Sequence, residues 1–545
     1  MTVLANPVEG AKPARVVLDH PVHWLLVAAF CVVLIGGLVF VGFNVFADTN
    51  HAGEPLAIGP FLFLGVALLI ALGFEFVNGF HDTANAVATV IYTHSLPPVV
   101  AVIWSGFWNF VGVVFSTGAV AYSIVTLLPV DLVLNVGSAG GYAMIFALLI
   151  AALIWNLGTW WLGLPNSSSH ALIGSVLGVG LANQLLSGGG GAGIASGVDW
   201  GQAKNVLMSL LISPVIGFTG ALLLMFLIKR MVRDPVLYSD PAGKVPPRGV
   251  RSLLIFTCTA VSFAHGGNDG QKGMGLIMLI LIGVAPAAYA LNRTMPDSST
   301  PAFIQQVEAA RSVFERYSGG IVVTAAEAPD VLEKAVHEQS VERPQLYAAL
   351  DVISADVVAQ IRSHGAIAHV PAAATRNLRN QMYLTSDALT FVMRDNGDSG
   401  SAALSATELG TLKTYQGGLN KGTRYIPTWV KISVALALGL GTVVGWKRIV
   451  VTVGEKIGKS HLTYGMGASA ELMAASTILM AEAAGMPVST THVLSSGVAG
   501  AMVANGSGCQ MGTVRNIALA WITTLPAAML LAGLLYALFL FVIKM

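Results

Sequence analysis

The stretches that decide the fold are two short polar motifs set in otherwise apolar sequence, NGFHDTANA at 78–86 and HGGNDGQKG at 265–273. They align on Asp82 and Asp269, which lie 187 residues apart. A second pair of motifs, GLPNSSSH at 163–170 and GMPVSTTH at 485–492, aligns at an offset of 322. Extended to twenty positions, this second pair shares eight identical residues. We interpret the chain as a duplication whose shared polar positions serve its function. The alternative is that the duplication is only an evolutionary remnant and that these positions have no functional role.

The composition excludes a soluble protein. The chain has 545 residues, of which 54% are hydrophobic and only 10% are charged, whereas soluble chains carry roughly 25% charged residues. A water-facing surface cannot be built from this composition, so a soluble enzyme, a nucleic-acid binder and a disordered scaffold are excluded, and the lipid bilayer is the expected environment. The net charge of +1 indicates no charged partner, and the three cysteines show no CxxC spacing.

Apolar runs of about 20 residues, the length of a membrane-spanning helix, recur along the chain. We therefore predict an all-α polytopic membrane protein. Several runs are short or interrupted, which is typical of broken helices in transporters. About twelve segments result: Trp24–Phe46, Ile58–Phe76, Val99–Thr117, Tyr142–Leu162, Pro165–Leu181, Val206–Ile228, Leu253–Ala264, Met274–Leu291, Trp429–Trp446, Met466–Ala484, Pro487–Ala504 and Val514–Ile543.

Charged residues concentrate in one internal stretch. Residues 292–428 hold 26 of the 57 Asp, Glu, Lys and Arg residues. The two motif offsets differ by 135 residues, close to the length of this stretch, so it was inserted into the second copy. Its runs 302–317, 329–362 and 372–394 mix apolar and charged residues at a helical period, which predicts a soluble helical insert. Its glycines, among them Gly410, Gly417, Gly418 and Gly422, predict a looser end.

Basic residues orient the chain, because cytoplasmic loops are enriched in Lys and Arg. The basic loops 229–251 and 447–459 are placed inside, and the loop 47–58, which has no Lys or Arg, outside. The two copies are then inverted, and the insert lies outside. The expected organisation is: 1–56, N-terminal tail and first membrane helix; 57–228, repeat 1; 229–251, basic cytoplasmic loop; 252–291, first part of repeat 2; 292–428, insert; 429–545, second part of repeat 2.

Asp82 and Asp269 are the first candidate site, because an ionisable residue inside a membrane segment is a functional-site hypothesis by default. Amide and imidazole side chains flank both: Asn78, His81 and Asn85 in copy one, and His265, Asn268 and Gln271 in copy two. The motif glycines permit unwinding, and freed carbonyls can coordinate a small cation. The carboxylates could serve Na⁺, H⁺ or a divalent metal, and the choice stays open. The alternative is a pair of buried carboxylates that only hold helices together.

The hydroxyl motifs are a candidate anion site. In each copy a Gly-x-Pro break precedes consecutive hydroxyls and an apolar helix, whose free N–H groups and positive dipole end attract an anion. The donors are Ser167, Ser168 and Ser169 in copy one, and Ser489, Thr490 and Thr491 in copy two. The alternative is that these hydroxyls satisfy their own helix backbone.

Further ionisable groups accompany these motifs. His170 and His492 could relay protons near neutral pH or cap helices. Glu75 and Glu471 are candidates for ion coupling, whereas Glu482 is expected at the membrane interface. Lys272 takes the place of Asn85 in copy two, where it could pair with Asp269 or extend toward the interface.

With these motifs the sequence resembles the PiT family of inorganic phosphate transporters, and looks closest to the bacterial low-affinity Pit type. The matching stretches are 78–93, 155–180, 263–287, 439–458 and 485–500. The resemblance implies inverted repeats, alternating access, homodimers and a multi-pass protein of the bacterial inner membrane. It implies phosphate carried with Na⁺ or H⁺, and for the Pit type a metal–phosphate complex taken up with protons. The family's paired motifs map onto Asp82, Asp269 and the two hydroxyl triplets, and a functional glutamate maps onto Glu471.

The expected function is secondary active import of inorganic phosphate, as metal–phosphate with H⁺ symport. Phosphate ligands are expected among the hydroxyls together with Asn85, Asn268 and Gln271. The alternatives are Na⁺ coupling, or a permease for sulfate or another oxyanion on the same scaffold. Neither HExxH, GxSxG nor a P-loop lysine occurs, so we expect no enzyme and no nucleotide or other cofactor.

Overall fold

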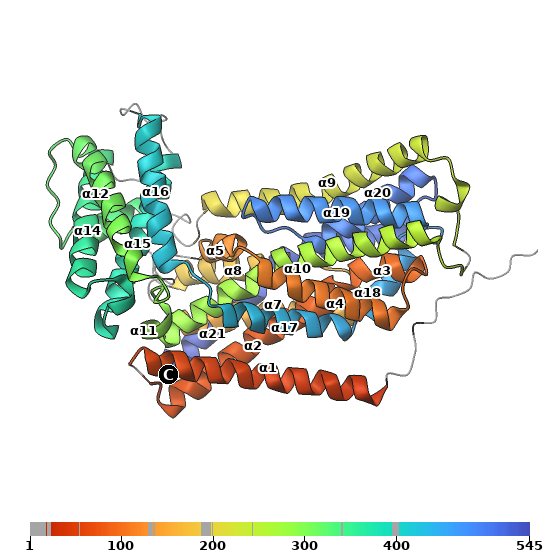
Figure 1. The fold of residues 1–545 in the computed structure, drawn as a ribbon, viewed down its shortest axis with the longest axis horizontal. Helices are drawn as coiled ribbons and strands as arrows, with labels where there is room; N and C mark the ends of the chain where they lie inside the picture. Colours follow the sequence, from red (N-terminus) through yellow and green to blue (C-terminus); the bar gives the residue numbers. More distant parts are fainter. Residues whose placement is uncertain are drawn as a thin grey trace, which may run out of the picture.

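A computed structural model describes residues 18, 23–53, 55–128, 133, 137–186, 198, 200–241, 243–338, 342–394 and 403–544. Most of the N-terminal tail called within 1–56 lies outside these residues. Within the described ranges every regular element is helical, and Gly458 and Cys509 form one isolated bridge. Figure 1 shows long helices running along one axis, with α12–α16 gathered at one end.

The bundle helices have the following bounds: α1 Trp24–His51, α2 Ile58–Asp82, α3 Ala84–Tyr92, α4 Pro98–Phe115, α5 Ala119–Val125, α7 Ala139–Trp161, α8 Ser168–Leu186, α9 Trp200–Met231, α10 Arg248–Val284, α11 Pro286–Tyr289, α17 Thr428–Val443, α18 Lys447–Val451, α19 Tyr464–Ala483, α20 Thr490–Asn505 and α21 Met511–Lys544. Short 3₁₀ turns lie at Pro235–Leu237, Asp297–Ser299 and Ile367–His369, and a π-helical turn lies at Thr452–Lys456.

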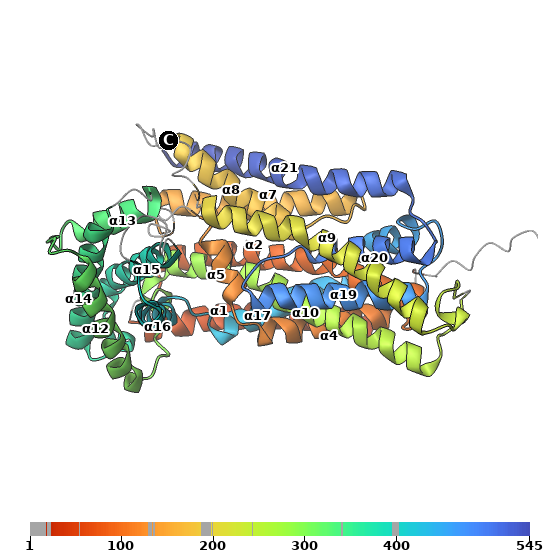
Figure 2. The same cartoon turned by 90° about the horizontal axis from the view of Figure 1, so that it is seen from above.

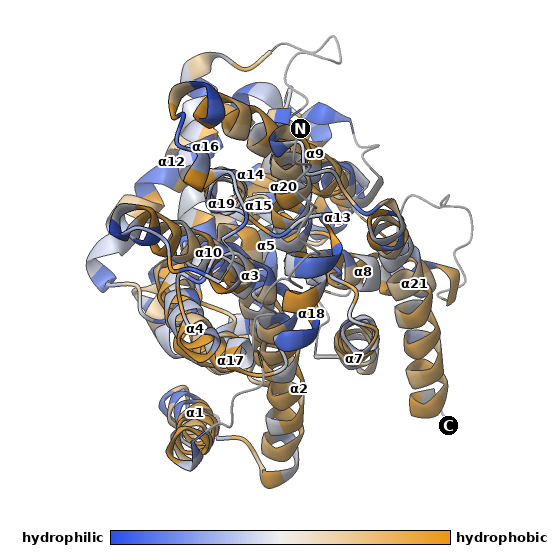
Figure 3. Cartoon of the chain, turned by 90° about the vertical axis from the view of Figure 1, so that its right-hand side faces the viewer, coloured by the Kyte–Doolittle hydropathy of each residue, from blue (hydrophilic) through white to orange (hydrophobic). Residues whose placement is uncertain are grey.

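Seven helical stretches of the described chain are long and apolar enough to cross a membrane. An eighth results if α16 and α17, which meet at a 73° bend, are counted as one. The coarse prediction of a helical membrane protein is therefore supported, whereas the number of twelve segments stays a prediction. The first apolar run forms α1, whose apolar side chains are largely exposed at the edge of the bundle (Figure 3).

The second aspartate motif is not unwound, contrary to expectation. Residues 253–264 and 274–284, expected in separate segments, belong to one continuous helix, α10, which passes through the motif. The motif glycines serve close packing instead: a Cβ on Gly266 would strike the backbone of Asn109 in α4, and one on Gly270 would strike Val113. α4 therefore packs tightly along α10, and a larger residue at these positions would separate the two helices. In copy one, α2 and α3 are separated by Thr83 alone, whose backbone angles stay helical (φ −71°, ψ −22°), so the stretch Ile58–Tyr92 runs on as one span.

Two further packing arrangements concern α21 and α1. Seen from above, α21 lies with α7 and α8 on the side of the bundle opposite α4 (Figure 2). α1 is fixed at its far end by Asp48, whose Oδ2 accepts hydrogen bonds from the Tyr289 hydroxyl and the Trp429 indole, each at 2.9 Å.

The insert is a helical unit with a hydrophobic core of its own. Its helices are α12 Thr300–Tyr317, α13 Ala328–Glu338, α14 Arg343–His364, α15 Ala372–Arg394 and α16 Ala406–Thr423. The expected looser end is wrong for 406–423, because α16 is a regular helix. Two of its glycines lie against neighbours: a Cβ on Gly418 would strike Phe303, and one on Gly422 would strike Met382, whereas Gly410 and Gly417 have open space. The insert and the loop 232–247 lie at opposite ends of the bundle (Figure 1).

Candidate functional site

Four helix segments meet at the candidate site: the end of α2, the middle of α10 and the first turns of α8 and α20. All eighteen predicted site residues are buried. These polar side chains are shielded from water and must find hydrogen-bond partners within the protein, since a buried polar group without a partner is costly.

Asp82 joins the aspartate motif to both hydroxyl motifs. Its Oδ2 accepts a hydrogen bond from Ser168 at 2.5 Å, and its Oδ1 accepts one from Thr491 at 2.9 Å. His81 Nδ1 lies 2.9 Å from the same Oδ1. The two kinds of site expected separately are therefore in direct contact around one carboxylate.

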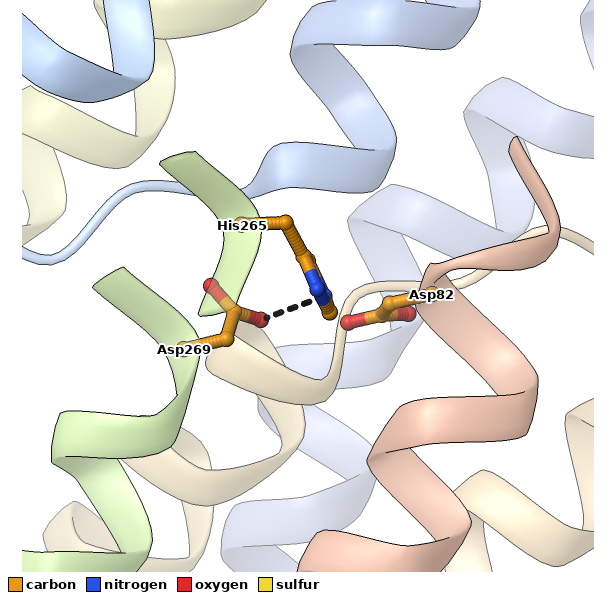
Figure 4. A group of neighbouring side chains, drawn as sticks. All are labelled: Asp82, His265 and Asp269. Carbon is orange, nitrogen blue, oxygen red and sulfur yellow. Dashed lines mark ion pairs between the residues drawn. The ribbon is translucent and has the colours of Figure 1, made fainter. Parts of the chain in front are cut away.

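Asp269 and His265 lie next to Asp82. Figure 4 shows the His265 ring between the two carboxyl groups, with His265 Nε2 3.5 Å from Asp269 Oδ2. The ligand atoms of Asp82, His265 and Asp269 all lie within 4.8 Å of one another, as in a site that could hold a metal ion. His265 Nδ1 is 2.9 Å from the amide oxygen of Asn109, which fixes the ring. Two carboxylates and one imidazole suit a divalent transition metal better than an alkali ion.

Lys272 resolves the choice left open by the sequence. Its ammonium lies 2.6 Å from Asp269 Oδ1 and donates a hydrogen bond to Ser169 Oγ. The side chain is fully buried, so it does not extend to the interface.

The first turns of α8 and α20 use their hydroxyls differently. Ser167 and Ser489 accept hydrogen bonds from the N–H groups of His170 and His492, at 3.2 and 3.1 Å, so these two serines act as helix caps. Ser169 donates to the carbonyl oxygen of Val488 at 2.9 Å and thereby ties the two motifs together.

Two further features lie at these helix starts. Thr490 Oγ1 is buried and has no hydrogen-bond partner among the described residues. The His170 and His492 rings lie 4.4 Å apart, and His492 stacks on Trp521.

The amides hold the motifs in place. Asn85 donates to Thr491 at 3.1 Å, and Asn78 accepts from Ser168 at 2.8 Å. Asn268 donates to the carbonyl of Met486 at 3.2 Å. Gln271 accepts from the N–H of Val120 at 2.9 Å and donates to Glu482 at 3.2 Å.

The two candidate glutamates have different surroundings. Glu471 on α19 accepts hydrogen bonds from Thr89 on α3 and Thr257 on α10. Glu75 lies one turn before Asn78, which donates to its Oε2 at 3.4 Å, while its Oε1 has no hydrogen-bond partner among the described residues. Glu75 also lies against Gly273, at the end of the second aspartate motif.

The sequence pattern of the phosphate transporter family matches residues 78–532. The chain belongs to the phosphate transporter family. This confirms the resemblance drawn from the motifs.

Two curated relatives are the low-affinity inorganic phosphate transporters PitA and PitB of Escherichia coli (strain K12). PitA is 40% identical over 497 residues, which cover 87% of this chain and 97% of PitA. PitB is 40% identical over 509 residues, which cover 88% of this chain and 98% of PitB. These relatives are named as transporters, so the expectation that the chain is no enzyme is confirmed.

One solved structure, described as "the sodium-dependent phosphate transporter", resembles this chain with a TM-score of 0.46 and 20% identity, covering 88% of this chain and 98% of that one.

Sequence reasoning missed several residues of this family member's site. Three such residues contact predicted site residues directly. Asn109 and Thr83 lie within hydrogen-bond distance of His265, and Thr89 donates a hydrogen bond to Glu471. Asn109 carried a usable signal, because an amide inside an apolar span needs a partner. Thr83 carried a signal as well, because it directly follows the aspartate of the first motif. Thr89 carried none, since isolated threonines in membrane helices commonly bond their own backbone.

Proposed function

We propose that this chain is a secondary active transporter that imports inorganic phosphate, as metal–phosphate with H⁺ symport. The family and the names of its relatives support phosphate as the substrate. The observation that carries the mechanism is the position of Asp82, whose carboxylate accepts hydrogen bonds from Ser168 in copy one and Thr491 in copy two.

This position makes Asp82 a competitor of the substrate. Hydroxyls at the first turns of two helices suit an oxyanion, and in this conformation a carboxylate already uses two of them. Phosphate that takes these donors leaves the Asp82 charge buried and unpaired, which is costly. A cation must therefore accompany phosphate, and this requirement couples the two.

The cation site we propose is formed by Asp82, His265 and Asp269. A divalent metal carried with phosphate would take one ligand atom from each of them and offset the charge of the substrate. A proton on one of the carboxyl groups would serve the same purpose, and protons are expected to reach the site through Glu471, Glu75 or the paired His170 and His492. Na⁺ in place of H⁺ is the first alternative.

We further propose that the two copies have inverted topology, and that the protein works by alternating access, in which the site opens in turn to either side of the membrane. The contact between Ser169 and the Val488 carbonyl supports a site shared by both copies, because it joins the starts of the two equivalent helices. Multi-pass insertion in the bacterial inner membrane, with the insert outside, and association as a homodimer complete the proposal.

Uptake into proteoliposomes tests this function. Purified protein is reconstituted, and radiolabelled phosphate uptake is measured under an imposed pH gradient, under a Na⁺ gradient, and with or without a divalent transition metal such as Mn²⁺. Accumulation driven by the pH gradient and dependent on the divalent metal is expected. Accumulation that needs only Na⁺ would establish the first alternative, and equilibration without accumulation would refute secondary active transport.

Sulfate is the competing substrate, because hydroxyl and amide donors can bind either tetrahedral oxyanion. Unlabelled sulfate in tenfold excess is expected to leave phosphate uptake unchanged. Inhibition equal to that by unlabelled phosphate would favour a general oxyanion permease.

A further inference from the structure

The contacts between the two copies at the site follow the duplication. Residue 85 of copy one aligns with residue 272 of copy two, because both lie three positions after the motif aspartate. Ser169 aligns with Thr491 at the offset of 322. In the structure Asn85 bonds to Thr491 and Lys272 bonds to Ser169. In each aspartate motif, the side chain three positions after the aspartate therefore hydrogen-bonds to the hydroxyl motif of the other copy.

The two equivalent contacts differ in chemistry. The contact from copy one is a neutral amide, while the contact from copy two is a buried ammonium group. The ammonium is held by Asp269 at 2.6 Å and lies 3.5 Å from the carbonyl of Val488, two residues before the start of α20. It is thus a fixed positive charge between the starts of α8 and α20, where the family's hydroxyls meet.

The hydroxyls show the matching asymmetry. Ser168 bonds to the aspartate of its own copy, whereas the equivalent Thr490 has no hydrogen-bond partner among the described residues. The counterpart aspartate, Asp269, is paired with Lys272 instead. The half of the site beside copy two therefore presents a free hydroxyl donor and a cation, and both attract an anion.

We propose that Lys272 is the fixed cation of the phosphate site: its ammonium contacts bound phosphate and takes the place of one mobile cation beside Asp269. The inference rests on the proposed function. A lysine that served only to neutralise Asp269 would have no need to reach Ser169 and Val488, and a buried ion pair by itself adds little stability.

The test is phosphate binding to the purified full-length protein, measured with radiolabelled phosphate at constant pH. Asp269→Asn removes both the partner of Lys272 and one ligand of the proposed cation site, so its dissociation constant is the reference for the double variant. The double variant Asp269→Asn/Lys272→Asn has the same loss at the cation site and leaves no unpaired ammonium, and it is expected to bind phosphate about tenfold or more weakly than Asp269→Asn, the effect of one charge-assisted hydrogen bond. A double variant that binds phosphate as well as Asp269→Asn overturns the proposal.

Lys272→Gln gives a second and independent reading. With Asp269 kept, a mobile cation can enter the place of the ammonium, so weak phosphate binding should recover as NaCl or MgCl₂ replaces choline chloride. Phosphate binding in Lys272→Gln that equals wild type without added Na⁺ or Mg²⁺ overturns the proposal, and so does weak binding that these cations do not restore. Lys431→Gln is the matched control, because Lys431 donates to the carbonyl of Ser116 away from the site, and it should bind as wild type.

Failure of the two proposals can be told apart. Wild-type protein that does not bind phosphate refutes the proposed function. Wild-type protein that binds phosphate, with the double variant indistinguishable from Asp269→Asn and with Lys272→Gln indistinguishable from wild type, refutes the role of Lys272 alone.

Discussion

The unequal use of two equivalent hydroxyls leads to a quantitative prediction. Ser168 already donates to the Asp82 carboxylate, whereas Thr490 has no hydrogen-bond partner among the described residues. When phosphate binds, Ser168 exchanges one anionic acceptor for another, but Thr490 gains a hydrogen bond. Removal of the Ser168 hydroxyl therefore destabilises both the phosphate-free and the phosphate-bound protein. Removal of the Thr490 hydroxyl destabilises only the phosphate-bound protein.

The magnitude follows from the worth of a hydrogen bond to a charged group, about 1.5–3 kcal/mol. Thr490→Val should raise the phosphate dissociation constant by about 10- to 150-fold. Ser168→Ala should raise it by clearly less, because the losses in the two states partly cancel. Equilibrium binding of radiolabelled phosphate to purified protein measures both effects.

Thr490→Ser is the matched control, since it keeps the hydroxyl and should bind within about twofold of wild type. Thr490→Val that binds as wild type would show that this hydroxyl does not contact phosphate. A larger loss in Ser168→Ala than in Thr490→Val would refute the exchange of Asp82 for phosphate.

Three further predictions follow from particular contacts. Asp82→Asn should reduce phosphate accumulation in proteoliposomes to the level seen without an ion gradient, and accumulation equal to wild type would remove Asp82 from coupling. Gly266→Ala should destabilise the protein by about 1–3 kcal/mol through overpacking against Asn109, measured by thermal unfolding, with Gly249→Ala, which has open space around its Cβ, as the unchanged control on the same helix. In the insert, hydrogen bonds from the Thr324 side chain and N–H lower the pKa of Glu327 from its usual 4.5. The stabilisation is therefore present above pH 4.5 and lost as the pH falls through the lowered pKa. The protection of amides at the start of α13, measured as their hydrogen-exchange rate relative to the intrinsic rate at the same pH, should therefore fall at low pH in wild type and not in Glu327→Gln.

Much of the site could be predicted from its local pattern. The motif aspartates were found because ionisable residues are rare in apolar spans, and the hydroxyl triplets because each follows a Gly-x-Pro break. The glycines of 265–273 were misread as a point of unwinding, since a glycine permits either a break or a close helix contact. Only the neighbouring helix chooses between them, and α4 lies directly against Gly266.

The sequence by itself indicated a helical membrane protein, the helical unit within 292–428 and the residue types of the site, because each of these is a matter of composition, periodicity or identity along the chain; the duplication stays a prediction. The tertiary structure decided which groups meet. Ser168, Thr491 and Asp82 come from segments separated by 86 and 409 residues, and Lys272 reaches Ser169 across 103. No local pattern specifies such pairings, because the fold fixes them through the packing of α2, α8, α10 and α20 around one buried point.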